Sequence, residues 1–204
     1  TALRTAAGQG VAAVHDLGGP HLGPIEDLTR VREVAADLGV GVTTYWGELA
    51  TEPTIEWARR AGIAGLAGDL CVDGAIGSHT ASLREPYADA VGCGARYLSE
   101  QQITDHVIAC TRAGLQAGFH CIGDDAVEAC VTGMRRAAAV LGIPAVRAAR
   151  HRLEHLEMVS AADMAPLAEL GVVASMQPAF DAAWGRRGEL YEQRLGRSRA
   201  RAMN

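Results

Sequence analysis

The fold class follows from residues 114–157, which read GLQAGFHCIGDDAVEACVTGMRRAAAVLGIPAVRAARHRLEHLE. Two short apolar runs in this stretch each end in a histidine, the first at His120 and the second at His155. Residues 125–141 between them show the apolar spacing of one helix. A strand, a helix and a second strand in this order favour a parallel α/β unit, in which ligands gather at the carboxyl ends of the strands.

The rest of the chain repeats this alternation. The pattern predicts strands at residues 11–16, 40–46, 65–72, 115–120, 150–155 and 172–177. It predicts helices over residues 24–38, 53–61, 99–113 and 125–141, another from residue 160 to about 171, and a last one over 191–202. Residues 84–98 have no clear period, and a long ordered excursion of this kind is usually functional. Six strands alternating with helices indicate a parallel sheet with right-handed crossovers.

Two architectures fit this alternation, a doubly wound sheet and a (β/α)₈ barrel. The first predicted strand is followed by DLGGP at residues 16–20, which is not the G-x-G-x-x-G fingerprint, and no G-x-x-x-x-G-K-[ST] motif occurs. Both observations weaken the nucleotide-binding version of the doubly wound sheet. A barrel needs eight strands and about 250 residues, so this chain as a barrel would lack strands.

Composition narrows the class of protein. The chain has 204 residues, 49% of them hydrophobic, and a net charge of -5, which is typical of a soluble globular protein. The mild acidity gives no reason to expect nucleic acid as a partner, and no apolar run approaches the ~20 residues of a membrane span. Five scattered cysteines without a Cys-x-x-Cys motif predict reduced thiols and a cytoplasmic location. Homodimer formation remains open.

The two histidines at predicted strand ends are the sharpest chemical signal. Neutral imidazole is a common zinc ligand, and His120 and His155 on neighbouring strands would be able to reach one ion. Catalytic zinc usually takes three protein ligands and a water molecule, so two histidines do not complete a site. The alternative is that both are core or rim histidines with ordinary hydrogen bonds.

Carboxylates near the third and fifth predicted strands are further candidates. Asp69 and Asp73 lie on one face of the third strand by its period of two, where they could ligate a metal or act as a base. Asp73 also precedes a glycine and fits an ordinary turn. Glu154 is expected to point to the opposite face from His155, towards the helices, and to pair with Arg150 or Arg152.

Three other side chains allow both a functional and an ordinary interpretation. His79 lies in a glycine-containing loop and could contact a substrate, but such residues are more often part of a turn. Arg84 could bind an anionic substrate group, although a solvated pair with Glu85 is the simpler interpretation. Cys121 follows His120 directly and is favoured as a structural thiol.

Four motifs resemble one known family. Residues 73–89 (DGAIGSHTASLREPYAD) resemble the loop after strand four in the amidohydrolase superfamily, in the amidohydrolase-3 branch that includes N-substituted formamide deformylases. Residues 120–124 (HCIGD) are similar to that branch's strand-five motif, and residues 152–155 (RLEH) to its strand-six motif. Residues 175–178 (SMQP) are similar to its strand-seven motif. The motifs occur in the family's order and span most of the chain.

The resemblance implies an α/β fold, an incomplete (β/α)₈ TIM barrel in which strands two to seven are present and strands one and eight are missing. Residues 1–204 would then be a partial barrel domain, an internal fragment. His120 and His155 would ligate a divalent metal, expected to be zinc. The family's other ligands, and the aspartate that acts as general base, lie on the absent strands. The chain alone would therefore be inactive and would retain metal weakly.

By the same resemblance, the candidates for substrate contact lie at the mouth of the barrel. They are Asp73, His79, Arg84 and Gln177. Many family members carry a lysine four residues before the strand-four aspartate, where its carboxylated form bridges two metals. Here that position is Asp69 and the chain contains no lysine, so no such bridge exists within it. Asp69 remains a candidate for direct ligation, and we expect one metal ion.

The implied activity is metal-dependent hydrolysis of an amide- or formamide-type carbon–nitrogen bond, other than a peptide bond, in a small-molecule substrate. A metal-activated water would be the nucleophile. The alternative is a catalytically inactive barrel that serves as a binding or regulatory protein. The aspartate at position 69 is the feature that favours this alternative.

Overall fold

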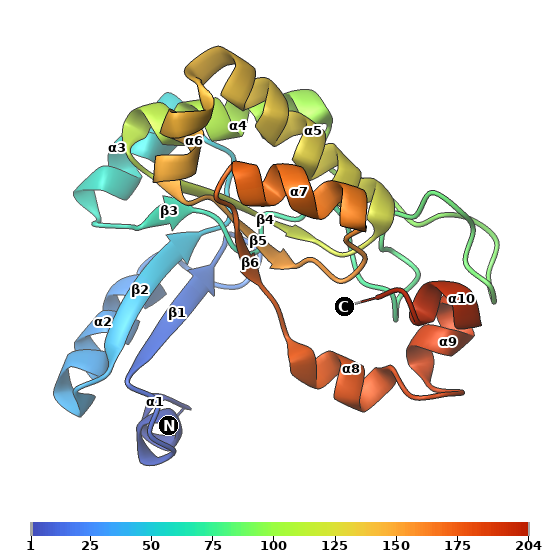
Figure 1. The fold of residues 1–204 in the computed structure, drawn as a ribbon. Helices are drawn as coiled ribbons and strands as arrows, with labels where there is room; N and C mark the ends of the chain where they lie inside the picture. Colours follow the sequence, from blue (N-terminus) through green and yellow to red (C-terminus); the bar gives the residue numbers. More distant parts are fainter. Residues whose placement is uncertain (1, 204) are drawn as a thin grey trace.

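The computed structural model describes residues 2–203 and contains one parallel sheet of six strands (Figure 1). The strands are β1 (Ala13–Gly18), β2 (Gly41–Trp46), β3 (Gly65–Leu66), β4 (Gln116–Cys121), β5 (Arg152–His155) and β6 (Val173–Ser175). Their order in the sheet is the order in the chain, from β1 at one edge to β6 at the other. Strand order reverses in a doubly wound sheet, so the sequential order identifies an incomplete, TIM-like barrel.

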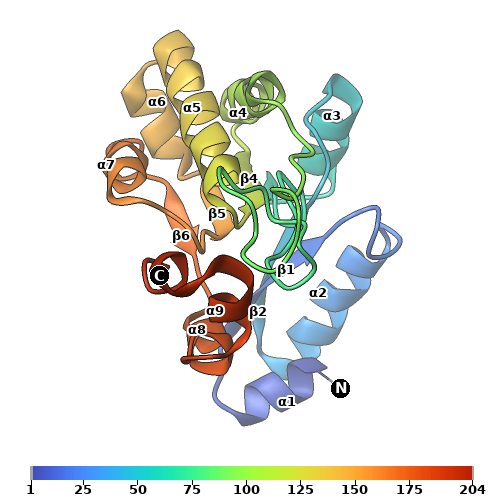
Figure 2. The ribbon, with the colours of Figure 1, turned by 90° about the vertical axis from the view of Figure 1, so that its right-hand side faces the viewer.

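Helices fill the connections between the strands. They are α1 (Ala2–Gly8), α2 (Asp27–Leu38), α3 (Glu52–Arg60), α4 (Glu100–Ala113), α5 (Asp124–Leu141), α6 (Ile143–Ala149), α7 (Ala161–Glu169), α8 (Pro178–Trp184), α9 (Leu190–Leu195) and α10 (Arg197–Ala200). Figure 2 shows that α2 to α7 surround the curled sheet, whereas α8, α9 and α10 form a group of their own. None of the helices within residues 2–203 has the length and apolar character that crossing a membrane requires.

The main core lies between the sheet and the helices that cover it. Phe119 of β4 and Leu153 of β5 are fully buried, as are Ile103 of α4 and Met134 of α5. A capping box at Ser99 begins α4, in which the Ser99 hydroxyl accepts the backbone N–H of Gln102. The apolar faces predicted from helical spacing therefore cover the outer face of the sheet.

The strand predicted over residues 65–72 is interrupted. β3 ends at Leu66, and Gly68 has φ 98°, a conformation that removes the chain from the sheet. A Cβ atom on Gly68 would lie 2.8 Å from the Cβ of Leu17, so the backbone also approaches β1 closely here. The chain rejoins the sheet at an isolated parallel bridge between Cys71 and His120. This detour separates Asp69 from the regular strand.

The helix prediction missed three short helices and joined two others. α1, α6 and α8 each have seven residues, too few for a strong periodic signal. Pro178 occupies the first turn of α8, where the backbone N–H that proline lacks would have no partner within the helix. The helix predicted over residues 191–202 is divided by Gly196, whose φ is 76°.

The long excursion between β3 and α4 packs against the C-terminal helices. Its apolar residues form a second buried cluster with Ile122 and two residues of α9, Tyr191 and Leu195. The backbone N–H of Ala88 donates to the carbonyl of Arg194 at 2.8 Å, and further bonds connect Arg199 with the excursion. The excursion and the α8–α10 segment thus form one layer at the carboxyl ends of the strands.

A buried ionic network crosses the concave face of the sheet. Arg152 donates to Glu154 through two nitrogens, to the Ser175 hydroxyl of β6 at 3.1 Å, and to Nδ1 of His15 in β1 at 2.8 Å. Its guanidinium also lies 4.7 Å from the centre of the Tyr45 ring in β2. The pairing of Glu154 with Arg152 is confirmed. The expectation that Glu154 faces the helices is wrong, because contacts with β1 and β2 are available only on the concave face.

We expect Arg152→Leu to lower the free energy of unfolding by about 3–5 kcal/mol, because it leaves the Glu154 carboxylate buried and unpaired. Urea denaturation measures the change. The matched control is Arg136→Leu, which removes an exposed ion pair with Glu100 and should cost no more than about 1 kcal/mol. Equal losses in the two variants would contradict a structural role for the network.

Candidate functional site

Asp73 organises the region around the carboxyl end of β4. It has no exposed surface, and its carboxylate accepts the backbone N–H of Ser82 at 2.8 Å. It also accepts the N–H groups of Ile122 at 3.0 Å and Gly123 at 2.8 Å, which follow β4. Asp73 thereby fastens the excursion to the strand end. Its side chain has no exposed surface and positions the neighbouring backbone, and substrate contact by Asp73 stays a prediction.

His120 stands at the end of β4 beside this carboxylate. Its Nδ1 lies 3.7 Å from Oδ1 of Asp73, and it is buried without a hydrogen-bond partner among residues 2–203. A buried ring nitrogen with no partner is costly, which favours an arrangement that supplies one. A histidine that ligates a metal commonly turns its other ring nitrogen to a carboxylate, and the position of Asp73 is consistent with that arrangement.

His155 reaches the same place through an unusual backbone. In the register of β4 and β5 it is opposite Cys121, which lies in the core with Cys130 of α5. A regular strand would therefore direct His155 towards the helices. Instead its φ is 69°, and that of Leu156 is 50°, both left-handed values that residues with side chains rarely adopt. With this backbone, the ring centres of His155 and His120 are 4.6 Å apart.

Gln177 fixes the orientation of the His155 ring. Oε1 of Gln177 lies 2.7 Å from Nδ1 of His155, and the amide nitrogen of Gln177 donates to the Ser175 carbonyl at 3.4 Å. With the amide so oriented, Oε1 can only accept, and Nδ1 must carry the proton. Burial lowers the pKa of His155, and the neighbouring His120 lowers it further, so the ring is neutral at neutral pH. Its Nε2 then keeps a lone pair free for a ligand.

Two imidazoles side by side fit two ligands of a divalent metal such as zinc. Asp69, the third residue expected from the sequence, is partly buried, and its charge favours the protonated form of His155. Within the described part of the chain, however, no group of three or more His, Cys, Asp or Glu side chains is placed to hold a metal ion. Metal ligation by Asp69 stays a prediction.

His79 and Arg84, also expected to contact substrate, both have partners within the chain, and substrate contact by either stays a prediction. His79 has Nε2 3.0 Å from Oδ1 of Asp89 on the excursion. Arg84 forms an ion pair with Glu128 of α5 at 3.0 Å, not with Glu85. Cys121 is fully buried, and its pKa is raised by the hydrogen bond with Cys130 and by burial, as expected of a structural thiol.

A pocket of about 280 Å³ opens beside His155, and we name it the β6 pocket. Nine residues line it: His155, Glu157, Met176, Gln177, Pro178, Phe180, Asp181, Tyr191 and Met203. The sequence predicted His155 and Gln177 among them. It missed Glu157 and Tyr191, although a glutamate two residues beyond a strand-end histidine was a usable signal. The sequence contains no such signal for Tyr191, because Tyr191 is far from both histidines along the chain and only the fold brings it near His155.

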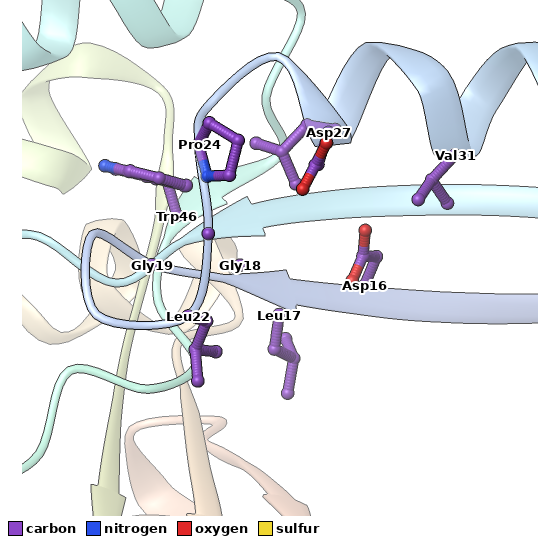
Figure 3. A pocket seen from close by; sticks show the side chains of 11 residues that line it. Asp16, Leu17, Gly18, Gly19, Leu22, Pro24, Asp27, Val31 and Trp46 are labelled. Carbon is purple, nitrogen blue, oxygen red and sulfur yellow. The ribbon is translucent and has the colours of Figure 1, made fainter.

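A second hollow lies between the end of β1 and the start of α2. It has a volume of about 210 Å³, and Figure 3 shows Asp16 and Asp27 directed into it. Burial raises the pKa of Asp16, and the negative charge of Asp27 raises it further. No histidine or cysteine lines this hollow, which separates it from the histidine pair.

A partial parallel barrel with paired imidazoles at its carboxyl ends defines the class of protein, an α/β barrel with a candidate metal centre. The model of the amidohydrolase family matches residues 1–204, and the chain belongs to that family.

Several known proteins are similar to this chain and longer than it. Uncharacterized metal-dependent hydrolases from Pyrococcus furiosus and Pyrococcus horikoshii OT3 share the fold, each with a TM-score of 0.73 and with 22% and 21% identity. Each match covers 99% of this chain but 41% and 40% of the respective neighbour. Protein LONG AFTER FAR-RED 3 of Arabidopsis thaliana is 28% identical over 124 residues, 60% of this chain and 20% of its own length. The chain therefore spans less than half of these proteins.

The pair of carboxylates in the second hollow gives a prediction about pH. A carboxyl group with a raised pKa in the folded state opposes folding when it is ionised. Asp16→Asn should therefore raise the melting temperature at pH 7, and the gain should disappear as the pH falls to the ordinary pKa of an aspartate, 3.8, and below. Thermal unfolding followed by circular dichroism across this range measures it. A gain that is independent of pH would contradict the electrostatic cause.

Proposed function

We propose that this chain forms part of a metal-dependent amidohydrolase that hydrolyses a carbon–nitrogen bond, other than a peptide bond, in a small amide or formamide. One observation carries the proposal. His120 and His155 lie 4.6 Å apart by ring centres at the carboxyl ends of adjacent strands, and each turns Nδ1 towards an oxygen of another side chain. This arrangement leaves both Nε2 atoms available as ligands.

A divalent metal held by these histidines would polarise the substrate carbonyl and lower the pKa of a bound water. The chain's own residues prepare that place. Gln177 holds the ring of His155, burial keeps that ring neutral, and the Asp73 carboxylate lies 3.7 Å from Nδ1 of His120. The β6 pocket beside His155 receives the rest of the substrate, and its apolar wall limits access of water to the reacting bond.

We propose that the remaining metal ligands and the proton-transferring group lie on barrel strands outside these 204 residues. Two facts support this view. The two Pyrococcus structures are about two and a half times as long as the part that this chain matches, and the described residues offer only a pair of suitable imidazoles. Zinc as the metal and amide-type specificity rest on the resemblance of the motifs at residues 73–89, 120–124, 152–155 and 175–178 to the amidohydrolase-3 branch.

The first test is a zinc titration of the chain against a colorimetric competitor. We expect weak Zn²⁺ binding that falls at least tenfold in His120→Ala and in His155→Ala, since each removes one of the ligands. His21→Ala is the matched control, because His21 is exposed and lies outside both the histidine pair and the β6 pocket. Unchanged Zn²⁺ affinity in the double variant would refute the metal centre.

The same double substitution tests hydrolysis in the barrel completed by its remaining strands. Amine release from N-substituted formamides should fall at least about a hundredfold, and a chelator should have the same effect on the unsubstituted protein. Amine release that persists at full rate in the double variant would contradict the proposal. Preference for the matching esters over the amides would contradict the carbon–nitrogen specificity alone.

The role of Gln177 gives a separate prediction. Gln177→Leu removes the acceptor for Nδ1 of His155 and should weaken Zn²⁺ binding about 10–100-fold, as expected for a residue that orients a ligand. Gln177→Glu keeps an oxygen in that place and should retain most of the affinity. If both variants bind Zn²⁺ as the original chain does, Gln177 does not orient the ligand.

A further inference from the structure

We propose that the β6 pocket binds a substituent of the amide substrate that combines a flat apolar body with a positively charged or hydrogen-bond-donating end. This inference rests on the proposed function, because it takes the pocket beside the candidate metal centre as the place of the substrate. It adds the chemical class of the substituent, which the resemblance to the family does not give. Three features of the pocket support it.

The first feature is a row of aromatic rings, of which His155, Phe180 and Tyr191 line the pocket and Trp184 lies between the last two. The ring of Phe180 is stacked nearly parallel to that of His155, with 6.2 Å between centres and 12° between planes. Trp184 continues the row at 4.6 Å from Phe180, and Tyr191 follows at 6.1 Å from Trp184. Rings in such a row offer flat faces and edges, which a planar apolar group contacts more favourably than a branched one.

The second feature is a buried hydroxyl group without a partner. Tyr191 is 4% exposed, and its Oη has no hydrogen-bond partner among residues 2–203, although the Glu157 carboxylate is its neighbour. Burial raises the pKa of Tyr191, so the hydroxyl keeps its proton. A buried polar group of this kind costs free energy until something satisfies it. A polar group on a ligand in this pocket would do so.

The third feature is the sign of the charge. Glu157, only 8% exposed, and the exposed Asp181 both line the pocket, and no arginine is among its nine lining residues. No guanidinium or ammonium group among the lining residues balances these carboxylates from within the pocket. A cation or a neutral donor gains from them, whereas an anion is repelled, and the effect is larger where water is excluded.

These features together select among simple compounds. Phenethylammonium has a phenyl ring and a cationic end, phenethyl alcohol has a neutral donor, and hydrocinnamate has an anionic end on the same framework. We expect affinity to fall in that order, with phenethylammonium at least about tenfold tighter than hydrocinnamate, the difference expected from one charge-assisted contact.

Trp184 provides the measurement, since it belongs to the aromatic row while Trp46 and Trp57 form a separate pair. Each compound is titrated against the chain in metal-free buffer, and the change in tryptophan fluorescence gives the affinity. Trp184→Phe should abolish the signal and thereby locate it. If none of the three compounds binds, or if hydrocinnamate binds as tightly as phenethylammonium, the proposal is overturned.

Substitutions identify the groups responsible. Glu157→Gln should weaken phenethylammonium about tenfold and leave phenethyl alcohol little changed, whereas Tyr191→Phe should weaken both. Asp181→Asn changes an exposed carboxylate and should lower phenethylammonium affinity without affecting folding. Glu56→Gln on α3, outside the pocket, is the matched control. Unchanged affinities in the three pocket variants would overturn the assignment.

The outcome is distinguishable from a failure of the proposed function. His120→Ala should lose Zn²⁺ binding and still bind phenethylammonium, because His120 does not line the β6 pocket. Selective binding of phenethylammonium without any histidine-dependent Zn²⁺ binding would support the proposed pocket and refute the metal centre. Histidine-dependent Zn²⁺ binding without selection for the cation would support the metal centre and refute the proposed pocket.

Discussion

The buried carboxylate of Asp73 is the constraint on which the site depends. A carboxylate with no exposed surface is stable only where hydrogen bonds replace water, and three backbone N–H groups supply them. Two of these N–H groups follow β4 and one belongs to the excursion, so a single side chain fixes both. The close approach leaves no room for a side chain at Gly123, where a Cβ atom would meet the Ser82 carbonyl at 2.0 Å. The position of His120 and the start of α5 follow from this junction.

The two histidines reach one another by different means. His120 continues a regular strand, whereas His155 needs a left-handed backbone to leave the face on which the strand register would place it. Left-handed residues with side chains cost free energy and persist where their surroundings hold them. Here the holding contacts are Gln177 on one side and the buried Leu156 on the other. An alternative arrangement with both rings in regular strands would have put them on opposite faces of the sheet.

The sequence was sufficient for the features that depend on periodicity and local chemistry. The six strands and the larger helices are of this kind, and so is the position of both histidines at strand ends. The direction of the Glu154 side chain could not be predicted from the sequence, because it depends on the hydrogen bond of Arg152 with His15 across the sheet. Tyr191 was not foreseen for the same reason: packing, rather than spacing, brings α9 to the end of β5. Contacts between distant segments leave no local signature in the chain.

The electrostatic balance around His155 explains why this arrangement suits a cation. Burial and the adjacent His120 favour the neutral ring, while Gln177, Glu154 and Asp69 favour the protonated one, and the net effect is a lowered pKa. The carboxylates of Glu154 and Asp69 therefore act on the imidazole, but they do not keep it protonated at neutral pH. Protonation would add one positive charge at the cost of the lone pair on Nε2, whereas a metal ion would add positive charge by using that lone pair. The same negative surroundings that fail to protonate His155 would thus stabilise an ion bound to it.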